Sequence, residues 1–163
     1  MAVICISIGS NTDREYHIRQ AVRALEQSFG VLQLSSVYES ESVGFVGDAF
    51  YNMVVAARTV LPVEDCIALF KQIEDQYGRV RDAERFSGRT LDLDLLTYDA
   101  LVCQQPIILP RPEITENAFV LWPLAEILPD SQHPVAGKTY RELWQGYAKS
   151  QKLWPVPFDW SKA

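Results

Sequence analysis

The sequence has few of the residues that bind transition metals or form disulfides. Its 163 residues include only three cysteines and two histidines. Cys5, Cys66 and Cys103 are widely spaced, odd in number and without a C-x-x-C pair, which is not the pattern of a zinc site or a disulfide framework. We therefore expect reduced thiols and a cytoplasmic location.

Long apolar runs and an excess of positive charge are also absent. No stretch approaches the roughly 20 apolar residues that a membrane-spanning helix needs. The start, Met1–Ile6, lacks the basic region of a signal peptide and is typical of a first strand. The net charge is −6 and the pI is near 4.9, whereas a nucleic-acid footprint needs a basic surface. We expect neither a membrane nor a nucleic-acid partner.

What the sequence does contain is enough apolar material for a core, arranged in alternating elements. Hydrophobic residues make up 48% of the chain, and we expect residues 1–163 to form one domain. Periodicity and turn residues predict the following elements. Strands are expected over 3–8, 31–38, 51–60 and 91–95, a turn over 9–11, and helices from a Thr12 or Asp13 cap to Gly30, from Pro62 to Tyr77, over 118–127 and over 139–147.

This order predicts an α+β fold. The first six elements run β-α-β-β-α-β, which is typical of a ferredoxin-like sandwich with helices on a mainly antiparallel sheet, here with additional C-terminal helices. The ending, residues 154–160, is rich in aromatic residues. We expect it to pack back on the sheet, and the alternative is an exposed contact patch.

Two aspartates stand in the last of these strands, in the run Leu91–Leu95. Side chains alternate along a strand, so Asp92 and Asp94 project from one face, about 7 Å apart at Cα, while the leucines face the other. Magnesium often uses one or two carboxylates together with substrate phosphates. The pair therefore indicates a metal site, and the alternative is the solvated face of an edge strand.

A cluster of arginines precedes that strand. Arg79, Arg81, Arg85 and Arg89 are four of the chain's ten arginines and fall within eleven residues. The guanidinium fork suits bidentate contact with phosphate oxygens. The cluster therefore indicates phosphate binding, unless the interspersed Asp82 and Glu84 merely neutralise it in a solvated loop.

Four blocks of sequence carry a resemblance to a known family: Ile8–Asn11, Phe50–Asn52, Gly78–Asp94 and Phe119–Leu124. Together, over nearly the whole chain, they resemble the 6-hydroxymethyl-7,8-dihydropterin pyrophosphokinase family of folate biosynthesis. The R-T-L-D-L-D core of the third block is the most specific.

The resemblance implies an ATP-dependent diphosphokinase with a ferredoxin-like fold. ATP would give its β,γ-pyrophosphoryl group to the hydroxymethyl oxygen of the reduced pterin, leaving AMP. By similarity, Asp92 and Asp94 would hold two Mg²⁺ ions, and Arg79 and Arg89 would grip the transferred phosphates. Further ATP contacts are implied for Glu74, Arg81 and Arg85. The family expectation for oligomeric state is a monomer.

The resemblance also implies a pterin pocket. Phe50 and Phe119 fall where the family places two stacking rings, and a flat heteroaromatic ring favours such an aromatic sandwich. Asn52 would offer an amide donor and acceptor to the pterin edge. Backbone groups of Ser40 and Val43 would add contacts. Core packing is the alternative for the two phenylalanines.

The carboxyl-terminal third departs from the family pattern. Arg111 stands where the family usually has a histidine of the nucleotide site, and Asn117 stands where it typically has an arginine. We hypothesise that Arg111 binds ATP and supplies the charge that Asn117 lacks. These departures, with an altered loop over 44–48, leave open a paralogue that acts on another pterin alcohol or only binds pterin and nucleotide. A palm-type nucleotidyl transferase or cyclase is a third possibility, because such enzymes also place acidic pairs on a strand.

Overall fold

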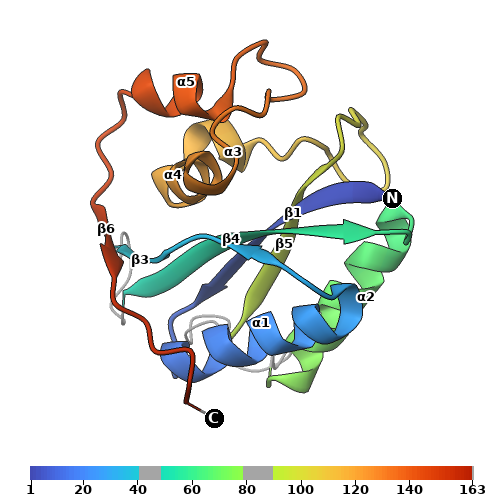
Figure 1. The fold of residues 1–163 in the computed structure, drawn as a ribbon, viewed down its shortest axis with the longest axis vertical. Helices are drawn as coiled ribbons and strands as arrows, with labels where there is room; N and C mark the ends of the chain where they lie inside the picture. The colour runs from blue at the N-terminus through green and yellow to red at the C-terminus, as the bar shows by residue number, and fades with distance from the viewer. Residues whose placement is uncertain (41–48, 79–89, 163) are drawn as a thin grey trace.

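The computed structural model describes residues 1–40, 49–78 and 90–162, which form one six-stranded antiparallel sheet with helices on both faces (Figure 1). The sheet order is β5-β1-β4-β3-β6, and β2 also pairs with β4. The strands are β1 (Ala2–Ser10), β2 (Gln33–Leu34), β3 (Val37–Ser40), β4 (Phe50–Thr59), β5 (Asp92–Tyr98) and β6 (Leu153–Val156).

The helices form a layer on each face of the sheet. One layer holds α1 (Arg14–Phe29) and α2 (Val63–Gln76), and the other holds α3 (Glu113–Glu116), α4 (Ala118–Ile127) and α5 (Tyr140–Gln145) (Figure 1). The element order from β1 to β5 confirms the predicted ferredoxin-like sandwich. The additional C-terminal helices cover the face that α1 and α2 leave open.

Strand alternation divides the core into two clusters, one for each face. Ile4, Ile6 and Ile8 of β1 pack against α1 and α2, whereas Cys5 packs with α4 and α5. Over residues 4–6, β1 is apolar and buried on both sides because helices cover both faces of the sheet there. Burial raises the pKa of the Cys5 thiol to about 11, so this thiol stays protonated and supplies no nucleophile.

Three differences from the sequence predictions lie in the segment from β1 to β3. The predicted strand over 31–38 is broken into β2 and β3, because Ser35 exchanges hydrogen bonds with Val54 through its N–H and its hydroxyl. The turn predicted over 9–11 begins later, since β1 continues to Ser10. Asp13 occupies the N-cap of α1 in a left-handed conformation with φ 42° and makes no capping bond through its side chain.

The C-terminal segment packs back on the sheet. β6 pairs with β3 and covers its edge, and the ring of Phe158 lies 6.3 Å from that of Tyr51 in an edge contact. Trp154 stays 43% exposed. The packing prediction for this tail is therefore confirmed for Phe158, while part of the aromatic surface remains open to solvent.

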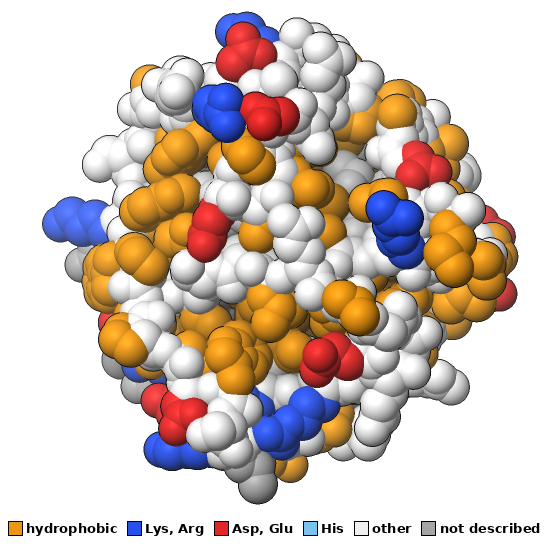
Figure 2. All heavy atoms as spheres, viewed as in Figure 1, with side chains coloured by type: hydrophobic (Ala, Val, Ile, Leu, Met, Phe, Trp, Pro, Cys, Tyr) orange, Lys and Arg blue, Asp and Glu red, His pale blue; other side chains and the backbone are white. Residues whose placement is uncertain are grey.

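Two observations bear on partners. In the view of Figure 2, acidic and basic side chains are interspersed, some of them side by side, and no continuous field of one sign is visible on this face. No helix in the described ranges is long and apolar enough to cross a bilayer.

Candidate active site

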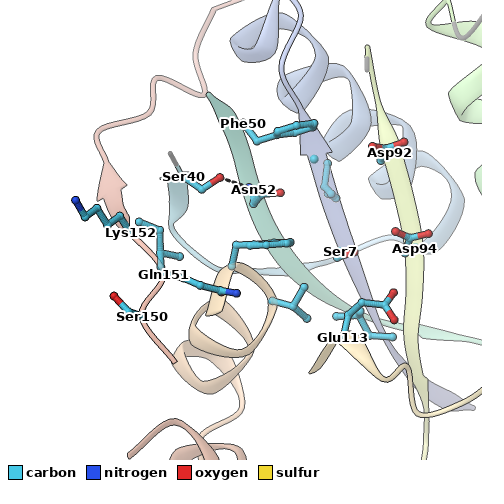
Figure 3. A pocket seen from close by; sticks show the side chains of 16 residues that line it. Ser7, Ser40, Phe50, Asn52, Asp92, Asp94, Glu113, Ser150, Gln151 and Lys152 are labelled. Carbon is cyan, nitrogen blue, oxygen red and sulfur yellow. Dashed lines mark hydrogen bonds between the residues drawn. The ribbon is translucent and has the colours of Figure 1, made fainter. Parts of the chain in front are cut away.

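A cavity of about 680 Å³ lies between the sheet and α4. Its floor comes from β1, β4 and β5, and its outer wall is the chain over 150–153. Figure 3 shows Asp92, Asp94 and Glu113 along one side, with Ser40 and Asn52 on the other. The sequence-predicted residues that line it are Ser40, Phe50, Asn52, Asp92, Asp94 and Phe119.

The two aspartates share the cavity face of β5. Gly9 and Ser7 of β1 lie opposite Asp92 and Asp94 in the antiparallel register, and Leu93 and Leu95 turn into the core under α1 and α2. The predicted alternation is confirmed. Among the described residues, no three His, Cys, Asp or Glu side chains are grouped to hold a metal ion. Two carboxylates on one strand face are ligands of the kind that Mg²⁺ takes together with substrate phosphates.

Arg111 connects this pair to a third carboxylate. Its Nε donates to Oε2 of Glu113 over 2.8 Å, and its Nη2 lies 3.6 Å from Oδ1 of Asp94. Sequence reasoning did not select Glu113, although its position two residues after an arginine could have indicated a charge pair.

A second, smaller cavity of about 160 Å³ lies between α2, β5 and the chain around Arg111. Glu74 lines it, is 6% exposed and accepts a 2.9 Å hydrogen bond from the N–H of Leu93. Lys71 adds a positive charge, and Asp94 lines both cavities. Two of the residues predicted to contact the nucleotide, Glu74 and Arg111, are thus brought together here.

The other side of the large cavity is built on β3 and β4. Ser40 pairs with Phe50 and Tyr38 with Asn52 in the register, and Asn52 donates from Nδ2 to the hydroxyl of Ser40 over 3.3 Å. This bond directs Oδ1 of Asn52 toward β1, where a Cβ on Gly9 would lie only 3.0 Å away. A glycine therefore leaves room for that amide, a role the sequence analysis did not assign to Gly9.

The C-terminal chain holds the α4 side of the cavity. Oε1 of Gln151 accepts a 2.6 Å hydrogen bond from the N–H of Ala118, the first residue of α4. Asn117, at the N-cap, makes no such bond with its side chain. The side chain of Gln151 thus caps the N-terminus of α4, next to Phe119. No sequence signal marks it, because the contact spans 33 residues.

The remaining predicted site residues lie outside the described ranges. These are Val43, Arg79, Arg81, Arg85 and Arg89.

The chain is similar to known proteins in both sequence and fold. Residues 5–129 match the family model described as 7,8-dihydro-6-hydroxymethylpterin-pyrophosphokinase (HPPK). A Bacillus subtilis (strain 168) protein named 2-amino-4-hydroxy-6-hydroxymethyldihydropteridine pyrophosphokinase is 42% identical over 75% of this chain and 75% of its own length. An Aquifex aeolicus (strain VF5) protein of the same name is 32% identical over 88% of this chain and 91% of its own.

A solved structure supports the fold. The crystal structure of wild-type Plasmodium falciparum HPPK-DHPS superposes with a TM-score of 0.73 at 14% identity, covering 90% of this chain. This chain spans only 44% of that crystallised chain. At 14% identity, the structural similarity shows only that the fold is shared.

Proposed function

The chain belongs to the 7,8-dihydro-6-hydroxymethylpterin-pyrophosphokinase family, and we propose from its two cavities how its residues carry out the reaction. The enzyme transfers pyrophosphate from ATP to the hydroxymethyl group of 6-hydroxymethyl-7,8-dihydropterin in folate synthesis. A new bond forms between the hydroxymethyl oxygen and Pβ, the bond from Pβ to the α,β-bridging oxygen breaks, AMP leaves, and the hydroxyl proton is released to solvent.

One observation carries the proposal: the same cavity collects the carboxylates of β5, the amide of β4 and the aromatic ring of α4. The pterin lies in this cavity between Phe50 and Phe119, with its polar edge at Asn52 and Ser40. Such a pocket, mostly apolar with a few convergent polar groups, suits a flat heterocycle. Val43 is proposed as a further contact from the sequence alone.

Part of the nucleotide binds at the smaller cavity. Glu74 and Arg111 line it, and Asp94 belongs to both cavities, so a phosphate chain that leaves this cavity at Asp94 reaches the pterin side. Arg79, Arg81, Arg85 and Arg89 bind the phosphates, a proposal that rests on their spacing in the sequence. Phosphoryl transfer depends mainly on such positioning and charge stabilisation.

Asp92 and Asp94 would hold the metal. Their oxygen donors, half-open to the cavity, fit Mg²⁺, and we propose two ions. When bound, Mg²⁺ offsets phosphate charge and lowers the pKa of the attacking hydroxyl. The chain's own residues orient the alcohol: the aromatic walls restrict the pterin ring to one plane, and the Asn52 amide sets its rotation in that plane. The pterin ring also displaces water from the cavity.

Further proposals concern the molecule as a whole. We propose that residues 1–163 form one domain, because β6 completes the sheet edge and Phe158 packs against its core. The free thiols of Cys5, Cys66 and Cys103 support a reducing, cytoplasmic location. A monomer is proposed on the sequence resemblance.

The direct test is a coupled assay for AMP. With ATP, Mg²⁺ and 6-hydroxymethyl-7,8-dihydropterin, we expect one AMP and one pterin diphosphate per turnover, and no AMP when the pterin is omitted. Tight pterin binding without AMP at high enzyme concentration would contradict the proposal and favour a protein that only binds. Turnover with a different pterin alcohol alone would favour the divergent paralogue.

Arg111→Ala tests the nucleotide side. We expect the KM for ATP to rise about 10-fold, because a charge-assisted contact to phosphate is lost, while the dissociation constant of the pterin stays within two-fold. Initial rates across ATP concentrations measure it. Arg141→Ala is the matched control, since Arg141 pairs with Asp130 on the surface. Unchanged ATP affinity and turnover in Arg111→Ala would refute the idea that Arg111 supplies the charge missing at Asn117.

A further inference from the structure

Arg14, the first residue of α1, lies on the opposite side of the sheet from the large cavity. Its side chain is 28% exposed. Three contacts hold it. Nη2 lies 2.6 Å from Oε2 of Glu39, Nη1 donates to the carbonyl oxygen of Ala49 over 2.7 Å, and its Cζ lies 3.9 Å from the centre of the Tyr51 ring. One guanidinium therefore contacts both β3 and the beginning of β4.

The residues that Arg14 contacts are immediate neighbours of the residues that face the pterin side. Glu39 pairs with Tyr51, and the next pair in the register, Ser40 with Phe50, lines the cavity. Successive side chains on a strand point to opposite faces. Tyr51 accordingly belongs to the core cluster under α1, while Phe50 and Asn52 face the cavity. Arg14 therefore contacts, from the α1 side of the sheet, the two strands that carry the cavity residues.

The contacts need an arginine in particular. A planar guanidinium can donate to a carboxylate and to a carbonyl in different directions while its face lies on an aromatic ring. A lysine ammonium is a compact charge that keeps the attraction to Glu39 but cannot reproduce the fork and the stacking together. The separation of β3 and β4 at this end of the hairpin therefore depends on the shape of the side chain as well as on its charge.

We propose that Arg14 is a positioning residue for the pterin substrate, which acts through Glu39, Ala49 and Tyr51 to set the spacing of Ser40, Phe50 and Asn52. This inference rests on the proposed assignment of the pterin to the large cavity. ATP binding should not depend on Arg14, because its contacts lie on β3 and at the start of β4, whereas Glu74 and Arg111 stand on α2 and on the chain after β5. Substitution of Arg14 should therefore weaken the binding of the pterin and leave the binding of ATP unchanged.

The test compares Arg14→Ala with wild type by steady-state kinetics in both substrates, by pterin binding followed through intrinsic fluorescence, and by urea unfolding. We expect the KM and dissociation constant for the pterin to rise about 10-fold, with the KM for ATP and kcat within two-fold. Arg14→Lys should restore part of the pterin affinity. Glu39→Gln removes the charge that pairs with Arg14, so it should also raise the dissociation constant of the pterin.

Arg23→Ala is the matched control, because Arg23 stands on the same helix and donates to the carbonyl of Lys162, away from the cavity. It should leave the pterin KM unchanged even if stability falls. A pterin KM within two-fold of wild type in Arg14→Ala, or an equal loss for both substrates that tracks unfolding, would overturn the inference while the proposed function stands. A wild-type protein that binds no pterin would overturn both.

Discussion

Asp94→Asn is expected to lower kcat by about 10²–10³-fold while pterin binding changes little. Asp94 lines both cavities, and its Oδ1 lies 3.6 Å from Nη2 of Arg111. Asparagine keeps the shape of the side chain and removes the negative charge that a hard cation requires. Losing one electrostatic stabiliser of a transition state typically costs that much in rate. AMP release under saturating substrates gives kcat, and fluorescence titration gives the pterin affinity.

Metal dependence separates this explanation from misfolding. The Mg²⁺ concentration for half-maximal turnover should rise in Asp94→Asn, and Mn²⁺ affinity measured without ATP should fall with it. Asp65→Asn, in the exposed first turn of α2, is the control and should behave as wild type. A kcat within ten-fold of wild type for Asp94→Asn would show that Asp94 is not a metal ligand of the reaction.

Asn52→Leu is expected to raise the dissociation constant of the pterin about 100-fold without changing that of ATP. The Asn52 amide is oriented by its bond to Ser40 and has its oxygen beside Gly9. Leucine has nearly the same size but cannot pair with the polar edge of the pterin. A pocket that leaves ligand polar groups unpaired discriminates strongly against that ligand. Calorimetry with each substrate alone measures both constants.

Ser40→Ala is the matched variant for Asn52→Leu. It removes only the partner of Nδ2 and leaves the amide in place, so the pterin affinity should fall by no more than about five-fold, the size of one neutral hydrogen bond. If Asn52→Leu binds the pterin within three-fold of wild type, the polar edge of the substrate lies elsewhere in the cavity.

Some elements could be predicted from the sequence because their signals are local. The helix over 118–127 was predicted with the bounds that the structure has, since its apolar pattern is continuous. The prediction of one continuous strand over 31–38 was wrong in the middle of the segment. Ser35 interrupts the strand there, because its N–H and its hydroxyl both hydrogen-bond to Val54 of the neighbouring strand. α3 and β6 were missed because each has four residues, and β6 forms only where the edge of β3 is available to pair with it.

The candidate site divides in the same way. Asp92 and Asp94 were expected on one face because strand alternation has a period of two. Gly9 and Gln151 were missed because their roles arise from contacts with β4 and α4 that no spacing in the chain reveals. Glu113 was missed although its partner Arg111 stands only two residues before it. Arg14 is the clearest case, since its two polar partners lie 25 and 35 residues away.

By itself, the sequence determined the chemistry: carboxylates on one strand face, aromatic rings and an amide suited to a pterin, and the order of elements that makes the sandwich. Only the tertiary structure decided which of these residues share a cavity, that Asp94 belongs to two cavities, and that Arg111 reaches both Asp94 and Glu113. The physical reason is the separation along the chain over which each kind of signal acts. Alternation and periodicity act between near neighbours in the chain, whereas a cavity is defined by strand register and packing between distant segments.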